Sequence, residues 1–115
     1  MLKTIPDLLQ EARQNVRTIT AKEANAEREQ NNGIIIDVRE PAEFEAGSAS
    51  GAVNVPRGLL EVKMLEMEKD PNRPIYLHCA SSLRAALGAE QLARVGYQNV
   101  SVITCSMDDI KKACC

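Results

Sequence analysis

Cys79, followed five residues later by Arg84, lies in the stretch of this sequence that is best suited to chemistry. The apolar run Ile75–His78 before it is typical of a strand, and the alanine-rich run Leu83–Val95 after it is typical of a helix. The first turn of a helix has backbone N–H groups without intrahelical partners, and these groups and the helix dipole favour an anion. A cysteine at such a turn is biased toward the thiolate, its nucleophilic form. We therefore predict that Cys79 is a nucleophile in an anion-binding turn.

Five short apolar runs alternate with helical patterns along the chain. The strands that we expect are Arg17–Ile19, Ile34–Ile36, Ala52–Val55, Ile75–His78 and Val100–Ile103. This alternation predicts an α/β fold, with a five-stranded, mostly parallel sheet covered by helices on both faces. Ligands bind at the C-terminal edge of the strands in such sheets. That edge is expected to gather Asp37, Cys79 and Cys105.

The expected helices are marked by start and stop signals. Thr4 and Thr20 each begin a pattern of capping residues. The stretch Asn31-Asn32-Gly33 is expected to end the second helix, with Gly33 able to take the left-handed conformation. Further helices are expected after Pro41, from Leu59 to Glu68, from Leu83 to Val95, and from Ser106 toward Ala113. Residues 1–16 are expected to form an amphipathic helix packed on a domain of residues 17–115, so that 115 residues make a single domain overall.

The composition argues against several classes of partner. The 14 basic and 16 acidic residues give a net charge of −2, and the aromatic residues are only Phe44, Tyr76 and Tyr97. Nucleic-acid binding normally needs a basic surface or aromatic stacking platforms, so we expect no nucleic-acid partner. No apolar run is long enough to span a membrane, and the first 16 residues lack the apolar core of a signal peptide. We expect no membrane contact and a cytoplasmic location.

The four cysteines are Cys79, Cys105, Cys114 and Cys115. In a reducing compartment they are expected to be free thiols. No two of them are separated by two residues and the chain has one histidine, so the sequence predicts no metal site.

Three segments carry a resemblance to a known family. Asp37–Phe44 and Gly47–Arg57 look like its first two signatures, and Cys79–Arg84 occupies the place of its active-site loop. Each motif is weak alone, but all three in this order are specific. The chain thus resembles the single-domain rhodaneses, or sulfurtransferases, from about Val16 to Lys112. The resemblance implies the rhodanese-like fold, and a monomer or weak dimer is expected.

The resemblance also implies roles for individual residues. Cys79 would carry a persulfide, and the backbone N–H groups of the loop would hold the transferred sulfur. Those loop residues are Ala80, Ser81, Ser82, Leu83 and Arg84, and Arg84 would also stabilise the loop. Asp37 would lie beneath it, Arg39 and Glu43 would form a supporting ion pair, and Asn54 and Arg57 would brace the rim.

The loop from Cys79 to Arg84 has six residues. Related phosphatases and arsenate reductases of this fold use a loop that is one residue longer, so the resemblance favours transfer of a single sulfur atom. The loop also departs from the family pattern, because Ser82 stands where glycine is usual and Ala80 where a basic residue is frequent. Further along, Ser48 replaces a histidine and Cys105-Ser106 replaces a pair of glycines. These departures favour a persulfide or protein-bound donor over thiosulfate.

The resulting hypothesis is a two-step sulfur transfer without a metal or an organic cofactor. Cys79 would take the outer sulfur from thiosulfate or a persulfide and pass it to cyanide or a thiol, with a sulfur-carrier protein as a further partner. Two alternatives remain open: a non-catalytic interaction module, and a phosphatase or arsenate reductase of the same fold.

Three other residues or pairs have alternative interpretations. Cys105 either relays the sulfur or merely fills the place of a glycine. Cys114 and Cys115 either form a thiol tail that exchanges sulfur or have no role in catalysis. His78 is adjacent to Cys79 but points to the opposite face of the strand, so it is expected to be a packing or surface residue.

Overall fold

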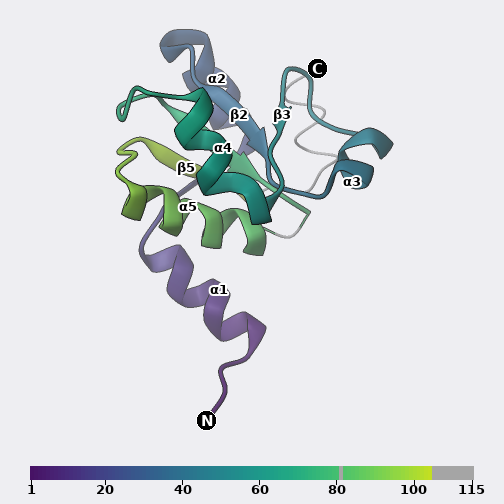
Figure 1. The fold of residues 1–115 in the computed structure, drawn as a ribbon, viewed down its shortest axis with the longest axis vertical. Coiled ribbons are helices and arrows are strands. Elements are labelled where there is room, and N and C mark those ends of the chain that lie inside the picture. Colours follow the sequence, from purple (N-terminus) through teal and green to yellow (C-terminus); the bar gives the residue numbers. More distant parts are fainter. Residues whose placement is uncertain (81, 105–115) are drawn as a thin grey trace.

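A parallel sheet with the strand order β1-β5-β4-β2-β3 forms the centre of the molecule (Figure 1). The structure is a computed structural model that describes residues 1–80 and 82–104. The strands are β1 (Arg17–Ile19), β2 (Ile34–Asp37), β3 (Val53–Asn54), β4 (Ile75–His78) and β5 (Val100–Ile103). All four strand pairings are parallel, which confirms the predicted α/β class and shows that the described sheet has no antiparallel strand.

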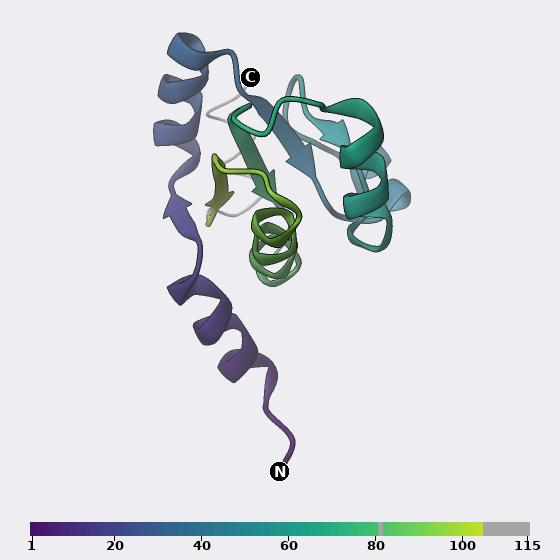
Figure 2. The same cartoon turned by 60° about the vertical axis from the view of Figure 1, so that its left-hand side comes forward.

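Helices cover both faces of this sheet (Figure 2). They are α1 (Ile5–Gln14), α2 (Ala21–Asn31), α3 (Pro41–Ala46), α4 (Leu60–Met67) and α5 (Leu83–Val95), with a 3-10 turn at Arg57–Leu59. Side chains of α4 and α5 pack on one face against Ile36, Leu77 and Cys79. Alanines of α2 pack on the other face against Ile35 and Tyr76. Consecutive residues of β2 and β4 thus point into the cores on opposite faces of the sheet, because side chains alternate along a strand.

The predicted starts of the first two helices are confirmed. Thr4 and Thr20 each form a capping box with the residue three positions later. The second helix ends at Asn31, as predicted, but the left-handed residue there is Asn32, with φ 57°, and not Gly33. Gly33 is needed for space instead, since a Cβ atom there would lie 2.6 Å from Cε2 of Tyr76. Asparagine tolerates the left-handed region better than most residues, so it can end the helix in the glycine's place.

Helix α1 lies beside α5 and extends away from the sheet toward the N-terminus (Figures 1 and 2). Ala12, near its C-terminal end, is buried, whereas Ile5 in its first turn is 58% exposed. The Asn15 side chain, just after the helix, donates a hydrogen bond to Glu90 of α5 at 3.1 Å. The end of α1 that leads into β1 is therefore the end that is held to the body.

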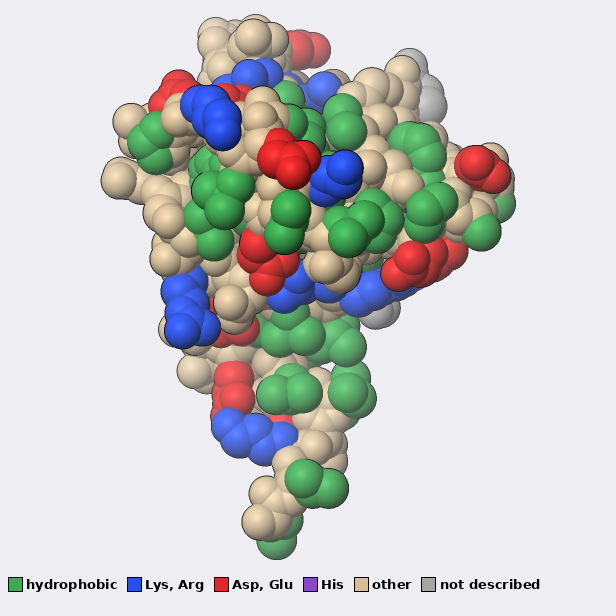
Figure 3. Space-filling model, in the orientation of Figure 1, with side chains coloured by type: hydrophobic (Ala, Val, Ile, Leu, Met, Phe, Trp, Pro, Cys, Tyr) green, Lys and Arg blue, Asp and Glu red, His purple; other side chains and the backbone are tan. Residues whose placement is uncertain are grey.

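Exposed apolar side chains lie among charged ones on the face over α4 (Figure 3). They are Leu59, Val62, Leu65 and Met67. No helix of the described chain is long and apolar enough to cross a membrane. The predicted last helix after Ser106 and the residues Cys105, Cys114 and Cys115 lie outside the described residues.

Candidate active site

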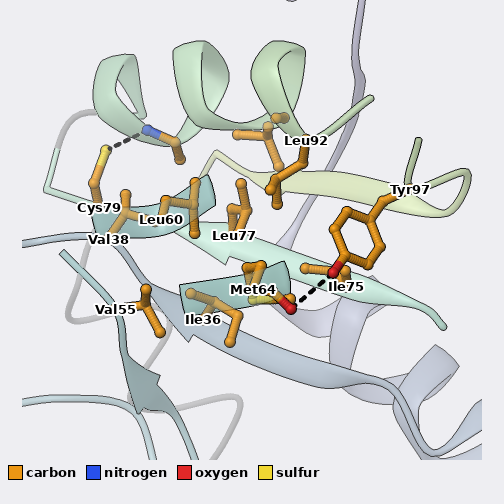
Figure 4. Packing of buried hydrophobic residues seen from close by; sticks show 13 residues of the cluster. Ile36, Val38, Val55, Leu60, Met64, Ile75, Leu77, Cys79, Leu92 and Tyr97 are labelled. Atoms are coloured by element: carbon orange, nitrogen blue, oxygen red, sulfur yellow. Dashed lines mark hydrogen bonds between the residues drawn. The ribbon is translucent and has the colours of Figure 1, made fainter. Parts of the chain in front are cut away.

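Cys79 follows the middle strand of the sheet, β4, at its C-terminal end. Its side chain points to the α5 side and is fully buried in the core cluster there (Figure 4). The backbone N–H of Ala85 donates a hydrogen bond to the Cys79 Sγ atom at 3.3 Å. Ala85 is the third residue of α5, so this N–H is one of those that have no partner within the helix. The sulfur therefore occupies the position where the helix N-terminus favours negative charge.

Ser82 forms the turn between the cysteine and the helix. Its φ of 65° and ψ of −6° place it in the left-handed region, which a residue with a Cβ atom adopts at a cost of about 1–2 kcal/mol. Ser82 stands where the resemblance expects glycine, and it takes a backbone conformation that glycine adopts more readily. The Ser82 carbonyl accepts a hydrogen bond from the N–H of Ala86 at 2.8 Å. Its hydroxyl accepts one from Nη2 of Arg13 at 2.8 Å.

The resemblance implied an ion pair between Arg39 and Glu43, but this expectation is wrong: Arg39 pairs with Asp37. Its Nε lies 3.0 Å from Oδ1 of Asp37, and its Nη2 lies 2.7 Å from Oδ2. These hydrogen bonds raise the pKa of the Arg39 guanidinium above its ordinary value. The physical reason for the choice of partner is burial: the Asp37 side chain has no exposed surface, whereas Glu43 is 38% exposed. A buried carboxylate without a cation would cost far more than an exposed one.

Glu43 pairs with Arg84, at 2.8 Å and 3.1 Å between their nitrogen and oxygen atoms. These hydrogen bonds are the largest cause that lowers the pKa of Glu43 to about 2. The pair connects the start of α5 to α3. Arg84, the last residue of the loop, thus ties the loop to the helix that carries Glu43.

The side chains of Asn54 and Arg57 contact two different elements near the site. The Asn54 amide donates hydrogen bonds to the carbonyls of Asp37 and Arg39, at 3.0 Å and 2.9 Å. The Arg57 guanidinium points to Glu61 of α4 at 2.7 Å. Asn54 therefore braces the segment that carries the buried ion pair, and the side chain of Arg57 braces α4.

His78 is fully buried. It alternates with Leu77 and Cys79 of one core cluster and is two residues after Tyr76 of the other, so it lies on the face of the sheet opposite Cys79. Its Nε2 atom lies 3.8 Å from Oδ2 of Asp37, and neither ring nitrogen has a hydrogen-bond partner within the described part of the chain. Burial is the largest cause that lowers the pKa of His78 below 6.5, opposed by the charge of Asp37 and reinforced by that of Arg39. The imidazole is therefore neutral at neutral pH, and of the two interpretations the packing residue is the correct one.

The lowered pKa of His78 predicts a loss of stability in mild acid. The unfolded chain takes up a proton near pH 6.5, but the folded chain does so only at lower pH. The free energy of unfolding is thus fully retained above about pH 6.5 and falls below it, with a slope approaching about 1.4 kcal/mol per pH unit. Urea unfolding between about pH 7 and pH 5 measures this slope. Because His78 is the one histidine of the chain, a His78→Leu variant with the same slope would refute the assignment.

Two predicted loop and relay residues, Ser81 and Cys105, lie outside the described residues. Their neighbouring strands are described: β4 pairs directly with β5, with Leu77 opposite Val102. Of the other loop residues, Ala80 is exposed and Leu83 is half-buried. Over residues 1–80 and 82–104, no three His, Cys, Asp or Glu side chains form a group that could hold a metal ion.

Two contacts at this site were not predicted. The first is the contact between the Ala85 N–H and the Cys79 sulfur, which was missed because Ala85 follows the six-residue loop. The N–H groups of a first helical turn generally lack partners, and this rule could have identified Ala85. Arg13 is 69 residues away from Ser82, and no local signal connects the two.

Comparison with known proteins shows the family. The model of the rhodanese-like domain matches residues 20–113. The chain belongs to the rhodanese-like domain family.

This rhodanese-like chain is 39% identical over 66 residues to an uncharacterized protein of Bacillus subtilis. The matched stretch covers 57% of the chain and 51% of that protein. It is 31% identical over 67 residues to a sulfurtransferase of Allochromatium vinosum, and this match covers 58% of the chain and 61% of that protein. The matches thus span about half to three-fifths of the length of these relatives.

Solved structures show the same rhodanese fold. A protein of unknown function from Rhodopseudomonas palustris, described as a possible tyrosine phosphatase, has a TM-score of 0.81 at 26% identity, covering 98% of this chain and 92% of that one. The polysulfide-sulfur transferase homodimer of Wolinella succinogenes has a TM-score of 0.74 at 26% identity, covering 88% and 77%. One of these two structural relatives is thus named a polysulfide-sulfur transferase, and the other is described only as a possible tyrosine phosphatase.

Proposed function

We propose that this chain is a sulfurtransferase that carries a sulfur atom as a persulfide on Cys79. The observation that carries the proposal is the hydrogen bond from the Ala85 N–H to the Cys79 sulfur, at the start of a helix and at the C-terminal edge of the sheet. Such a donor stabilises a thiolate and, after reaction, the negative charge of a persulfide. Relatives named sulfurtransferase and polysulfide-sulfur transferase support the same reaction class.

The reaction proceeds in two displacement steps. In the first, the Cys79 thiolate attacks the outer sulfur of the donor, and an S–S bond forms. The bond between that sulfur and the rest of the donor breaks, and its electron pair leaves with sulfite from thiosulfate or with a thiolate from a thiol persulfide. In the second, cyanide or an acceptor thiolate attacks the outer sulfur, and the Cys79 thiolate is regenerated. No external oxidant or reductant is required.

The charged pairs around the loop contribute by positioning it. Arg84 and Glu43 join the start of α5 to α3, while Asp37 and Arg39 hold the segment after β2. Arg39 and Arg84 are each paired with a carboxylate, so neither of these two arginines offers an unpaired positive charge to a small anion. The loop position Ala80 also lacks a positive charge. A thiol persulfide or a sulfur atom on a partner protein therefore fits this loop better than thiosulfate does.

The class of partner is supported by two further relatives. A Bacillus subtilis protein named as a candidate sulfur carrier is 32% identical over 75 residues, and this match covers 65% of the chain and 40% of that protein. An adenylyltransferase and sulfurtransferase of Meyerozyma guilliermondii is 32% identical over 76 residues, covering 61% and 18%. A sulfur-carrier protein is accordingly the proposed macromolecular partner.

Phosphate hydrolysis is the second candidate function, because the structural relative from Rhodopseudomonas palustris is described as a possible tyrosine phosphatase. The six residues from Cys79 to Arg84 argue against it, since related phosphatases use a longer loop.

Intact mass spectrometry tests the proposal. The chain is incubated with thiosulfate, and separately with a thiol persulfide, and then with cyanide. We expect a gain of one sulfur atom, larger in extent with the persulfide, and its removal by cyanide as thiocyanate. Hydrolysis of p-nitrophenyl phosphate without any sulfur gain would favour the phosphatase. Absence of both reactions would leave the non-catalytic interaction module.

A further inference from the structure

The hydrogen bond between Arg13 and Ser82 joins the N-terminal helix to the candidate active-site loop. Nη2 of Arg13 lies 2.8 Å from the Ser82 hydroxyl oxygen, across 69 residues of sequence. The family model begins to match at residue 20, so Arg13 lies outside the matched domain. The loop therefore receives a contact from a segment that the family match does not include.

Arg13 is placed at this point by the way in which α1 is attached. The neighbouring Ala12 is 1% exposed, and α1 as a whole contacts α5. Asn15 donates a hydrogen bond to Glu90 of α5 at 3.1 Å. Contacts on both sides of Arg13 thus fix the backbone from which its side chain reaches the loop.

The conformation of Ser82 determines both the turn of the loop and the start of α5, so a contact to Ser82 from outside the loop can affect the site. Its left-handed backbone, with φ 65°, is unfavourable for a residue with a Cβ atom. The same turn determines how α5 starts, because the Ser82 carbonyl accepts the N–H of Ala86. It also determines the direction of the Ala85 N–H, which points to Cys79 Sγ. Any other Ser82 conformation would redirect the hydrogen-bond donor that the sulfur uses.

We propose that Arg13 is a positioning residue for the active-site loop. By holding the Ser82 hydroxyl, it keeps the turn in the conformation in which the Ala85 N–H meets the Cys79 sulfur. Serine can then stand where the family usually has glycine, because an arginine from α1 offsets the cost of the left-handed turn. This inference rests on the proposed role of Cys79 as the nucleophile, and it makes α1 a functional part of the site.

A double-mutant cycle tests the inference. The variants are Arg13→Ala, Ser82→Gly and the combination, and the rate of persulfide formation on Cys79 is measured in a single turnover. Hydrogen bonds to charged groups are worth about 1.5–3 kcal/mol, so Arg13→Ala is expected to slow the reaction by about tenfold or more. In the Ser82→Gly background the same change is expected to slow it by less than about twofold, since glycine needs no help to adopt the turn.

Arg94→Ala is the matched control. Arg94 is an exposed arginine in the last turn of α5, so its removal changes the net charge equally at the end of the helix away from the loop. Arg13→Lys should recover most of the lost rate, because a lysine still donates a hydrogen bond. Equal slowing by Arg13→Ala in the serine and glycine backgrounds would overturn the inference and indicate that Arg13 attracts an anionic donor by its charge.

Alkylation of Cys79 separates this inference from the proposed function, because it requires no sulfur transfer. Peptide mapping after treatment with neutral iodoacetamide and with anionic iodoacetate gives the rate at Cys79. We expect Arg13→Ala to slow both reagents by the same factor if it acts through Ser82. A chain that takes up no sulfur but shows this slowing would refute only the proposed function. Equal alkylation rates at Cys79 with and without Arg13 would refute only the positioning role.

Discussion

A Cys79→Ser protein is expected to gain no sulfur atom from thiosulfate or a thiol persulfide, and the rate of thiocyanate formation is expected to fall at least about 1,000-fold. A serine hydroxyl is almost entirely protonated at neutral pH and cannot form a persulfide, whereas a thiolate can. Serine is close to cysteine in size, and its oxygen can still accept the hydrogen bond that the Ala85 N–H donates to the sulfur in the wild-type protein. The loss should therefore affect the chemistry far more than the fold.

The measurement combines intact mass, peptide mapping and thiocyanate formation, with the thermal unfolding midpoint as the control for folding. Peptide mapping matters because the chain has three more cysteines at Cys105, Cys114 and Cys115. A sulfur atom that still appears on a folded Cys79→Ser protein would assign the nucleophile to one of them.

Asp37→Asn is expected to lower the free energy of unfolding by about 3–5 kcal/mol. The side chain of Arg39 is 8% exposed and that of Asp37 is fully buried, so neutralising the carboxylate leaves a buried positive charge without a counter-charge. The change keeps the shape of the side chain, and the loss is thus electrostatic. A domain of this size has a stability of about 5–15 kcal/mol, so the variant should lose a large fraction of it.

Glu43→Gln is the matched comparison for this variant. It also neutralises the carboxylate of an arginine pair, but the side chains of Arg84 and Glu43 are 34% and 38% exposed. Solvent screens such pairs, and the expected loss is below about 1 kcal/mol. Urea unfolding of both variants gives the two values. Similar losses from the two changes would show that the burial of Asp37 does not set the energy of its pair.

Local signals were sufficient to predict the elements that form the site. The strand Ile75–His78 and the helix Leu83–Val95 have the predicted bounds, and both capping threonines have the predicted contacts. These features depend on residues within one or two turns of each other, so the sequence contains them directly. The order of the strands was not derivable in this way, because it depends on which strands pair across the sheet.

The partner of Arg39 shows why the remaining contacts could not be predicted. Arg39 and Glu43 are four residues apart, and that spacing makes an ion pair plausible. Folding instead buries Asp37 completely, and the buried carboxylate takes the arginine while Glu43 pairs with Arg84 from α5. Burial is a property of the packed molecule, so a choice between partners that depends on burial cannot be read from their spacing.

The turn after β4 combines both kinds of information. The pattern of residues predicted that Cys79 follows a strand and precedes a helix. The family resemblance added that the loop from Cys79 to Arg84 has six residues and that Ser82 stands where glycine is usual. Packing of the folded chain sets the two other contacts, from the Ala85 N–H to the sulfur and from Arg13 to the Ser82 hydroxyl. The Arg13 contact depends on packing, because helix α1 is brought to the loop by its contacts with α5. The local conformation of this turn follows from neighbouring residues, whereas the contacts that the turn receives from other elements follow from the packing of residues far apart in the sequence.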